Sequence, residues 1–320
     1  MKDINKRDFL KTVGTGSASL ALAGCVGTAT KDLVQPIESG FKPSDKVTLK
    51  IKGAVKPFDF VHITDVHLCQ CDSRDPERVD DLAYRRKRFM QPQETAKRLF
   101  KHINTLKTDF VALTGDYVDI PTQANLELGG ELLDSLDTDF GFSVGNHEWS
   151  GQALPPERDY WLSQFSVWTP QPMDWYYRRI NGVNLLFLDD SDYQITEHQL
   201  KRTKALLDTG RPCIMFVHIP IIEDSLVAPV TKKWGRPICL GGQQDASHDQ
   251  KRKPWWKQLP EVKQTTKEFL KLIKSHPQMK AIFAGHLHFD HKGQFQKGCH
   301  QYVTGAAYEN VYRKIEIVPG

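Results

Sequence analysis

Three features that would place a sequence in a specialised class are scarce in these 320 residues. Six cysteines are too few for the disulfide scaffold of a small secreted domain. The net charge of +4, from 43 Lys and Arg against 39 Asp and Glu, is too small to indicate a nucleic-acid partner. Internal repeats and low-complexity tracts are missing as well. With 39% hydrophobic and 26% charged residues, the composition is that of an ordinary soluble globular protein, which excludes a disordered chain and a polytopic membrane protein.

The first 25 residues are typical of an export signal and are set aside from the fold. A basic start precedes a mildly apolar run, residues 12–23, that is too short and too polar to span a bilayer. The following Leu22-Ala23-Gly24-Cys25 resembles the lipobox of bacterial lipoproteins, in which cleavage precedes a cysteine that is then lipidated. The block Lys6-Arg7-Asp8-Phe9-Leu10-Lys11 also resembles a twin-arginine export motif, although Lys6 stands where that motif has its first arginine.

We therefore expect a lipoprotein signal peptide at 1–24, a tether at 25–46 and a folded domain at 47–320. A multiply acylated Cys25 would anchor the protein stably to a membrane. The resemblance implies export to the periplasmic side, and Val26 after the cysteine favours the outer membrane in a Gram-negative cell. Removing residues 1–24 takes away four basic and two acidic residues and leaves a net charge of +2. Any attraction for an anionic substrate must therefore be local.

Beyond residue 46, short apolar runs alternate with amphipathic helical patterns, which predicts an α/β fold with a largely parallel sheet. Strands are expected at Val47–Ile51, Phe58–Ile63, Phe110–Leu113, Phe140–Val144, Val183–Leu188, Cys213–Val217, Ala281–Ala284, His300–Val303 and Val311–Val318. Helices are expected at Arg88–Thr105, Leu126–Ser135, Glu157–Gln164, Thr196–Leu207 and Val262–Ser275. The last two strands have no helix between them, which suggests a hairpin. No linker follows the tether, so we expect one domain.

Five of these apolar runs end in side chains that bind metals. The segments are Asp65-Val66-His67, Gly115-Asp116-Tyr117-Val118-Asp119, Gly145-Asn146-His147-Glu148, His218 and Gly285-His286-Leu287-His288. Ligands gather at the carboxyl ends of strands in α/β folds. Residues two apart in an extended segment point the same way, so Asp65 and His67 should face one site, as should His286 and His288. The donors are nitrogen and oxygen only, which suits Mn, Fe or Zn.

This ordered series resembles the calcineurin-like metallophosphoesterases from Phe58 to about Gly305. The resemblance implies a four-layer α/β/β/α sandwich of two mixed sheets and two metal ions that activate a water to hydrolyse phosphoric mono- or diesters. One ion would be held by Asp65, His67, Asp116 and His288, and the other by Asp116, Asn146, His218 and His286. His147 would act beside the leaving group as a general acid or charge stabiliser. Asp119 and Glu148 would orient imidazoles.

Departures from the family's motifs narrow the subfamily. Ile120 and Val144 stand where phosphoprotein phosphatases of this superfamily carry arginine, and His67 and Asp119 differ from the residues of purple acid phosphatases. What remains is the broad bacterial group of secreted phosphodiesterases and phosphomonoesterases. The stretch from His286 to His291 also matches the H-x-H-x-D-H signature of metallo-β-lactamases. Only 29 residues follow it, with a single further histidine, so that interpretation lacks its downstream ligands.

The segment 222–261 is long for a connection in an α/β fold. It contains cations and indoles, so it is a candidate lid whose side chains bind a phosphate ester. The candidate substrate-binding residues are Trp234, Arg236, Trp255 and Trp256. The alternative is a surface excursion whose tryptophans pack on their own domain. A second aromatic group is either an opposite wall or core, and it comprises Trp149, Trp161, Trp168 and Trp175 to Tyr177.

Three further questions stay open at this point. In an oxidising compartment, Cys69 and Cys71 are candidates for a disulfide with Cys239 or Cys299, and the sequence does not fix the pairing. The oligomeric state is undetermined. The rival function is that of a metal-binding lipoprotein that has lost catalysis and serves as a recognition module, against which the intact His147 argues.

Overall fold

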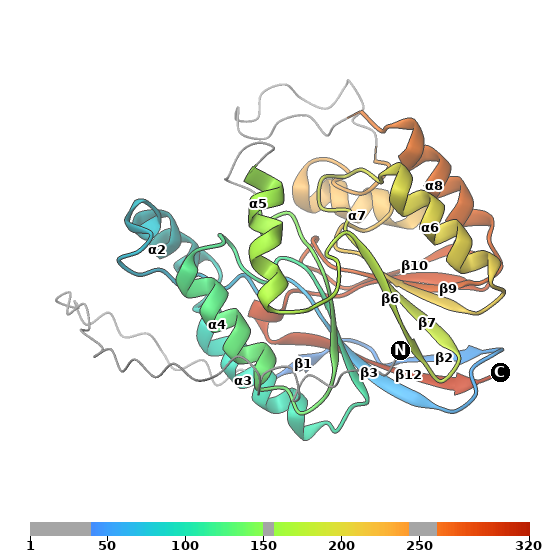
Figure 1. Cartoon of the computed structure of the whole chain (residues 1–320), viewed down its shortest axis with the longest axis horizontal. Helices are drawn as coiled ribbons and strands as arrows, with labels where there is room; N and C mark the ends of the chain where they lie inside the picture. Colours follow the sequence, from blue (N-terminus) through green and yellow to red (C-terminus); the bar gives the residue numbers. More distant parts are fainter. Residues whose placement is uncertain (1–39, 150–156, 243–260) are drawn as a thin grey trace. The chain divides into compact units, whose positions relative to one another are not determined.

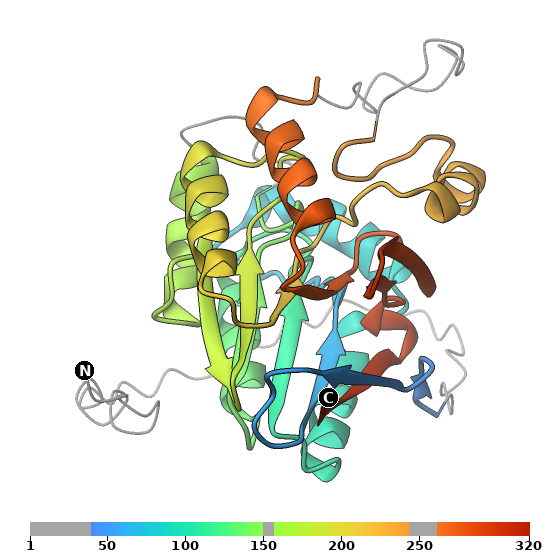
Figure 2. The ribbon, with the colours of Figure 1, turned by 90° about the vertical axis from the view of Figure 1, so that its right-hand side faces the viewer.

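Two mixed sheets of six strands each face one another, and helices cover the outer face of each sheet (Figure 1, and turned by 90° in Figure 2). The structure is a computed structural model that describes residues 40–149, 157–242 and 261–320. Cys25, the signal segment, most of the tether, Trp255 and Trp256 lie outside the described residues. Within the described part, none of the helices has both the length and the apolar character needed to cross a membrane.

The first sheet has the order β1-β12-β3-β4-β5, with β2 also paired to β12. Its strands are β1 (Lys42–Pro43), β2 (Val47–Ile51), β3 (Phe58–Ile63), β4 (Phe110–Thr114), β5 (Phe140–Ser143) and β12 (Val311–Pro319). β3, β4 and β5 are parallel, whereas β12 runs antiparallel to β3. The carboxyl ends of β3, β4 and β5 therefore lie at one edge.

The second sheet has the order β10-β11-β9-β8-β7-β6. Its strands are β6 (Trp175–Ile180), β7 (Val183–Leu188), β8 (Cys213–Phe216), β9 (Met279–Ala284), β10 (His291–Gln296) and β11 (Cys299–Val303). β7, β8, β9 and β11 are parallel, and the two edge strands are antiparallel to their neighbours. The central strands of both sheets thus have the largely parallel arrangement that the sequence predicts.

The helices form the two outer layers. On the first sheet, α3 (Pro92–Thr105) and α4 (Gln123–Asp134) pack their apolar faces against residues such as Val61. On the second sheet, α6 (Glu197–Asp208) and α8 (Gln264–Ser275) pack against residues such as Met215. The remaining helices are α2 (Val79–Arg88), α5 (Glu157–Gln164) and α7 (Asp224–Trp234), with single 3-10 turns at Pro76–Arg78, Phe165–Val167 and Ala307–Glu309.

Aromatic rings fill the space between the two sheets. Phe187, Phe216, Phe283 and Tyr302 stack in sequence across β7, β8, β9 and β11, with ring centroids 4.7, 5.6 and 5.1 Å apart. Phe60 of β3 meets this stack edge-on from the opposite sheet, 5.4 Å from Phe216. Alternate residues of the central strands point to this core or to a helix layer, so strands such as β4, β7 and β8 are buried on both faces and are mainly apolar. The predicted four-layer sandwich of two mixed sheets is confirmed.

The predicted hairpin of the last two strands is wrong. β11 belongs to the second sheet and β12 to the first, and the 3-10 turn Ala307–Glu309 carries the chain between them. The hairpin lies one strand earlier, between β10 and β11, and turns at Gly298, whose φ is +79°. β10 was not predicted because it is an edge strand that buries only Gly293 and Phe295. β6, the other edge strand of this sheet, was not predicted either, and most of its residues are partly exposed.

The helix predicted at Arg88–Thr105 begins only at Pro92, and the helix α2 that precedes it was not predicted. α2 ends at Arg88, and α3 begins at Pro92, with Met90 and Gln91 in left-handed conformations between them. A proline opens a helix readily but cannot continue one, and it disfavours a helical conformation in the residue before it. The sequence signal for this break was Pro92.

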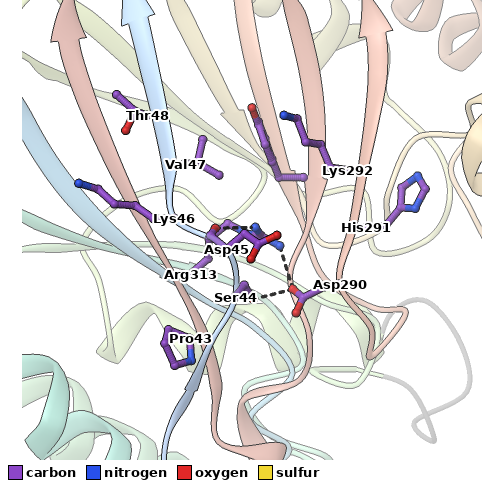
Figure 3. Close-up of a pocket in the computed structure, with 11 residues that line it drawn as sticks. Pro43, Ser44, Asp45, Lys46, Val47, Thr48, Asp290, His291, Lys292 and Arg313 are labelled. Atoms are coloured by element: carbon purple, nitrogen blue, oxygen red, sulfur yellow. Dashed lines mark hydrogen bonds and ion pairs between the residues drawn. The ribbon is translucent and has the colours of Figure 1, made fainter.

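The last residues of the predicted tether belong to the first sheet. β1 pairs in parallel with the start of β12, and the Ser44 hydroxyl donates to Asp290 Oδ1 at 2.6 Å. Arg313, whose side chain is 4% exposed, donates to Asp290 Oδ1 at 2.8 Å and to the Asp45 carbonyl at 3.0 Å. Figure 3 shows these groups at one side of a polar cavity of about 540 Å³. A buried guanidinium therefore ties the first strands to the end of the chain.

We predict that Arg313→Ala lowers the free energy of unfolding by about 2 kcal/mol, because it removes the charged donor of the buried Val303 carbonyl and of the half-exposed Asp290 carboxylate. Lys46→Ala is the matched control, since Lys46 pairs with Glu316 at 2.7 Å but is 58% exposed. Its cost should be no more than about 1 kcal/mol. Urea unfolding at neutral pH measures both. Equal losses for the two variants would contradict the assignment of Arg313 as the tie.

Candidate metal centre

Loops from both sheets meet at one edge of the sandwich. Those after β3, β4 and β5 come from the first sheet, and those after β8 and β9 from the second. The approach is closest at Gly285, where any Cβ atom would collide with the Thr64 hydroxyl. The backbone N–H of His286 donates to Asp65 Oδ2 at 2.9 Å, and His218 Nδ1 lies 2.7 Å from the Thr114 carbonyl oxygen. Backbone contacts thus join the two sheets directly at the cluster.

Five of the predicted metal-binding residues have left-handed backbones. They are Asp65, His67, Asp116, His286 and His288, with φ between +48° and +67°. The expectation that Asp65 and His67, and likewise His286 and His288, lie in extended segments is therefore wrong. Asp65 and His67 still face one group of ligands, whereas His286 and His288 face two adjoining groups. Each pair alternates left-handed residues with a buried Val66 or Leu287. Such conformations cost of order 1–2 kcal/mol per residue and cluster at functional sites.

The first group contains Asp65, His67, Asp116 and His288, the set predicted for one ion. His67 Nε2 and His288 Nε2 lie 3.1 Å apart, and His288 Nε2 is 3.1 Å from Asp65 Oδ1. His67 Nε2 is 3.8 Å from both Asp65 Oδ1 and Asp116 Oδ2. The ligand atoms of the group all lie within 4.8 Å of one another, so they converge on a volume that one cation can occupy.

The second group contains Asp116, His218 and His286, three of the four residues predicted for the other ion. His218 Nε2 is 3.1 Å from Asp116 Oδ2 and 3.2 Å from His286 Nδ1. The fourth residue, Asn146, has a buried Oδ1 atom with no hydrogen-bond partner among the described residues. Asp116 belongs to both groups, as expected for a bridging carboxylate.

Outer hydrogen bonds fix which nitrogen of each imidazole faces the cluster. His67 Nδ1 meets Asp119 Oδ1 at 3.0 Å, and His218 Nδ1 meets the Thr114 carbonyl. His288 Nδ1 meets the Tyr308 hydroxyl at 3.0 Å, whereas His286 uses Nε2 to meet the Tyr193 hydroxyl at 2.8 Å. In each ring the other nitrogen points toward the cluster, which is the arrangement of metal-binding histidines.

The pKa values of the cluster residues also indicate a site for cations. Burial by itself favours a neutral ring, but Asp116 raises the pKa of His218 to about 10. Burial would raise the pKa of Asp65, yet His288 lowers it to about 2. Burial, followed by the charge of His218, lowers the pKa of His286 to about 3. A proton on His218 must leave before that nitrogen binds a metal, so metal binding releases protons.

These residues fit a pair of divalent cations. The buried Asn146 Oδ1 without a protein partner, the convergent imidazole lone pairs and the shared carboxylate are the donors that such a site uses. The set contains nitrogen and oxygen ligands and no thiolate, which suits Mn, Fe or Zn. One group would hold each ion, with Asp116 between them.

His147 lies beside the cluster and is 24% exposed. Its Nδ1 is 2.6 Å from Asp119 Oδ1, and its Nε2 is 3.9 Å from Asp116 Oδ2. Burial would lower the pKa of His147, but Asp116 and Asp119 raise it to about 9. The imidazolium is therefore held at the edge of the site, where it can donate a proton. Asp119 touches both His67 and His147, so it is placed to orient two rings.

Glu148 was expected to orient an imidazole, but its carboxylate contacts backbone N–H groups instead. Its carboxylate accepts hydrogen bonds from the backbone N–H groups of Gly145, Asp116, Tyr117 and Val118, at 2.6 to 3.2 Å. It therefore fixes the loops that follow β4 and β5 relative to each other. Burial, and then repulsion by Asp116, raise its pKa to about 7.

Sequence reasoning missed several residues of the site. Tyr193, Tyr308 and Arg85 contact ligands or Asp119, and Asp190 Oδ1 accepts the backbone N–H groups of His218 and Ile219, each at 3.1 Å. For Asp190 a signal existed, because an acidic pair follows the apolar run of β7 just as ligands follow the other strands. Tyr308 and Arg85 come from segments without such a pattern.

The proposed lid begins as a helix, because residues 224–234 form α7. Trp234 packs its ring edge against His288, with centroids 5.6 Å apart, and donates from Nε1 to the Leu287 carbonyl at 3.1 Å. Lys233 Nζ donates to the His288 carbonyl at 2.6 Å. α7 therefore supports the metal-binding loop. Arg236 is half-buried, and burial lowers its pKa.

The second aromatic group is divided. Trp168 and Trp175 are buried, each in the hydrophobic cluster between one sheet and its helix layer. Trp149 is half-buried and donates from Nε1 to Ser191 Oγ at 2.9 Å. Tyr176 is buried and Tyr177 is partly exposed. The side chain of Trp161 lies outside the described residues. Most of the group is therefore core.

The disulfides that were left open do not form among the described cysteines. Cys69, Cys71, Cys213, Cys239 and Cys299 are all free thiols. Cys69, Cys239 and Cys299 belong to three different hydrophobic clusters, which keeps them apart.

The family follows from this geometry and from a sequence comparison. Residues 58–290 match the family model for calcineurin-like phosphoesterases. That match spans well over half of the chain, so the chain belongs to the calcineurin-like metallophosphoesterase family. It is a metal-dependent phosphoesterase with a buried His/Asp cluster for two metals.

Comparisons with individual proteins give more distant likenesses. No curated protein matches this chain significantly in sequence. Among solved structures, a dimetal phosphatase from Danio rerio shares 13% identity over 79% of this chain and 88% of that chain, with a TM-score of 0.49. A purple acid phosphatase from yellow lupin (Lupinus luteus) seeds shares 12% identity over 80% of this chain and 45% of that chain, with a TM-score of 0.48.

His62 is a buried structural histidine and tests the acid stability of the fold. Its nitrogens meet the Thr304 and Thr114 hydroxyls, each at 2.8 Å, and burial, then the charge of Arg313, lower its pKa to about 3. In the unfolded chain the pKa of His62 is near 6.5, so below that pH the unfolded chain binds a proton on His62 that the folded protein does not bind. Stability therefore falls as the pH drops from 6.5 toward 3, by up to about 1.4 kcal/mol per pH unit.

We predict that His62→Gln removes this contribution. The variant should lose stability at pH 7.5, but its deficit against the wild type should shrink steadily between pH 6.5 and 4.5. Urea unfolding at each pH measures the deficit. A deficit that stays constant over this range would show that His62 does not titrate on unfolding.

Proposed function

We propose that this protein hydrolyses phosphoric mono- or diesters at its metal centre, outside the cytoplasm. The single observation that carries the catalytic part is the position of His147, whose Nε2 lies 3.9 Å from Asp116 Oδ2 and whose Nδ1 lies 2.6 Å from Asp119 Oδ1. A protein that only held metals would have no use for a proton donor at the edge of the cluster.

Different residues of the chain would bind the metals, donate the proton and hold the loops in place. Asp65, His67, Asp116 and His288 would hold one ion, and Asp116, Asn146, His218 and His286 would hold the other. Such a pair of divalent ions would lower the pKa of a water and neutralise the charge that develops on phosphoryl oxygens. His147 donates a proton to, or stabilises charge on, the leaving group. Asp119 fixes the orientation of His147, and Glu148 holds the loops that position Asn146.

We predict that the Mn²⁺-loaded protein turns over bis-p-nitrophenyl phosphate or p-nitrophenyl phosphate. His147→Ala should lower kcat by about 10²- to 10⁴-fold with both metals retained, because it removes a general acid and no ligand. Asp116→Ala should lower the metal content itself. His198→Ala is the control, since this histidine of α6 is 58% exposed and pairs only with Asp174 among the described residues. Release of p-nitrophenol and elemental analysis measure the two effects.

The rival function gives a different outcome in the same experiment. A metal-loaded wild type that turns over neither ester would favour a recognition module without catalysis. Wild-type activity in His147→Ala would instead overturn the assigned role of this residue.

The location rests on the N-terminal sequence, in which Cys25 follows Leu22-Ala23-Gly24. We propose lipidation of Cys25 after cleavage and anchoring on the periplasmic side, at the outer membrane in a Gram-negative cell. We predict that cells fed a clickable fatty acid label the wild type and not Cys25→Ser. Label on both, or on neither, would contradict the anchor.

A further inference from the structure

The short helix α2 is attached to the domain at the metal centre. Leu82 is its one buried residue, so apolar packing alone holds it weakly. Phe89, just beyond its end, stacks on the ring of His67 with centroids 4.1 Å apart and planes 10° from parallel. Arg86 donates to the Cys69 carbonyl at 2.9 Å. α2 therefore forms a wall beside His67, on the side of the first group.

Arg85 points from this wall to Asp119. Its Nη1 donates to Asp119 Oδ2 at 2.8 Å, and the other oxygen of that carboxylate meets His67 and His147. Asp119 is fully buried, whereas the Arg85 side chain is 30% exposed. The guanidinium thus extends from a buried carboxylate to the solvent at the edge of the site, next to the proposed proton donor.

The remaining donors of Arg85 are available for a ligand. Among the described residues, the bond to Asp119 is the one hydrogen bond that the Arg85 side chain makes. A guanidinium has five N–H donors in a planar fork, which suits it to bind a carboxylate and a phosphoryl group at the same time. Among the described residues that contact Asp119 through their side chains, Arg85 is also the one with a permanent positive charge.

We propose that Arg85 is a substrate-binding residue that donates to a non-bridging phosphoryl oxygen of the ester while Nη1 stays on Asp119. This deepens the proposed function and rests on it. The substrate then presents a charged phosphoryl oxygen on the α2 side of the centre. Because a charge-assisted bond to phosphate is strong, its loss weakens binding of both the ester and inorganic phosphate.

The test compares Arg85→Gln and Arg85→Lys with Arg86→Gln in the full chain loaded with Mn²⁺. Arg86 is the matched control, since it lies on the same helix, is also half-buried and donates to the Cys69 backbone carbonyl rather than to a side chain of the cluster. The readouts are kcat, KM, metal content, and binding of inorganic phosphate by calorimetry. Arg85→Gln should raise KM and the phosphate dissociation constant about 10- to 100-fold. Arg85→Lys should fall between, and millimolar guanidinium should restore part of the binding to Arg85→Gln.

Two results would overturn the proposal. One is unchanged phosphate affinity in Arg85→Gln, even with a lower kcat, because Arg85 would then act only through Asp119. The other is an equal loss in Arg86→Gln, which would indicate damage to α2 as a whole. Arg85→Lys keeps the charge on Asp119 and replaces Arg85→Gln if the latter does not fold. Failure of the proposed function is separate, since it appears as a wild type without turnover whose phosphate binding can still depend on Arg85.

Discussion

The buried carboxylate of Asp116 is the constraint on which the rest of the structure depends. It lies where the two sheets meet, 3.1 Å from His218 Nε2 and 3.8 Å from His67 Nε2, and its other oxygen accepts the backbone N–H of His147 at 2.8 Å. A buried carboxylate is costly unless it is paired or coordinates a metal. Cations bound by this carboxylate and the surrounding imidazoles would offset the free energy that burial of the charge and the left-handed residues cost.

The arrangement of the two sheets brings these groups together. Parallel strands place their carboxyl ends at one edge, and two sheets packed face to face bring two such edges into contact. The aromatic stack from Phe187 to Tyr302 and the edge-on Phe60 hold the sheets in register behind the site. A second set of contacts then selects the metal-facing nitrogen of each imidazole, through Asp119, Thr114, Tyr193 and Tyr308.

Most strands were predictable because they contain runs of buried residues that are mainly apolar, as in β4, β7 and β8. The exceptions have local causes. β10 is an edge strand whose exposed residues conceal it, and Pro92 separates α2 from α3. The pairing of β11 and β12 with different sheets could not be read from their proximity in the chain, because strand partners are chosen by burial of the whole sheet rather than by sequence distance.

The sequence by itself determined the fold class, the family and the residues that gather at the site, because metal binding demands particular side chains at strand ends and these demands are local. Only the tertiary structure decided how they are arranged. The left-handed backbones of Asp65 and His67, the loop-fixing role of Glu148, and the arrival of Arg85 and Tyr308 beside the cluster all depend on segments far apart in the chain. Contacts of this kind follow from packing two sheets and their loops together, which no single stretch of sequence encodes.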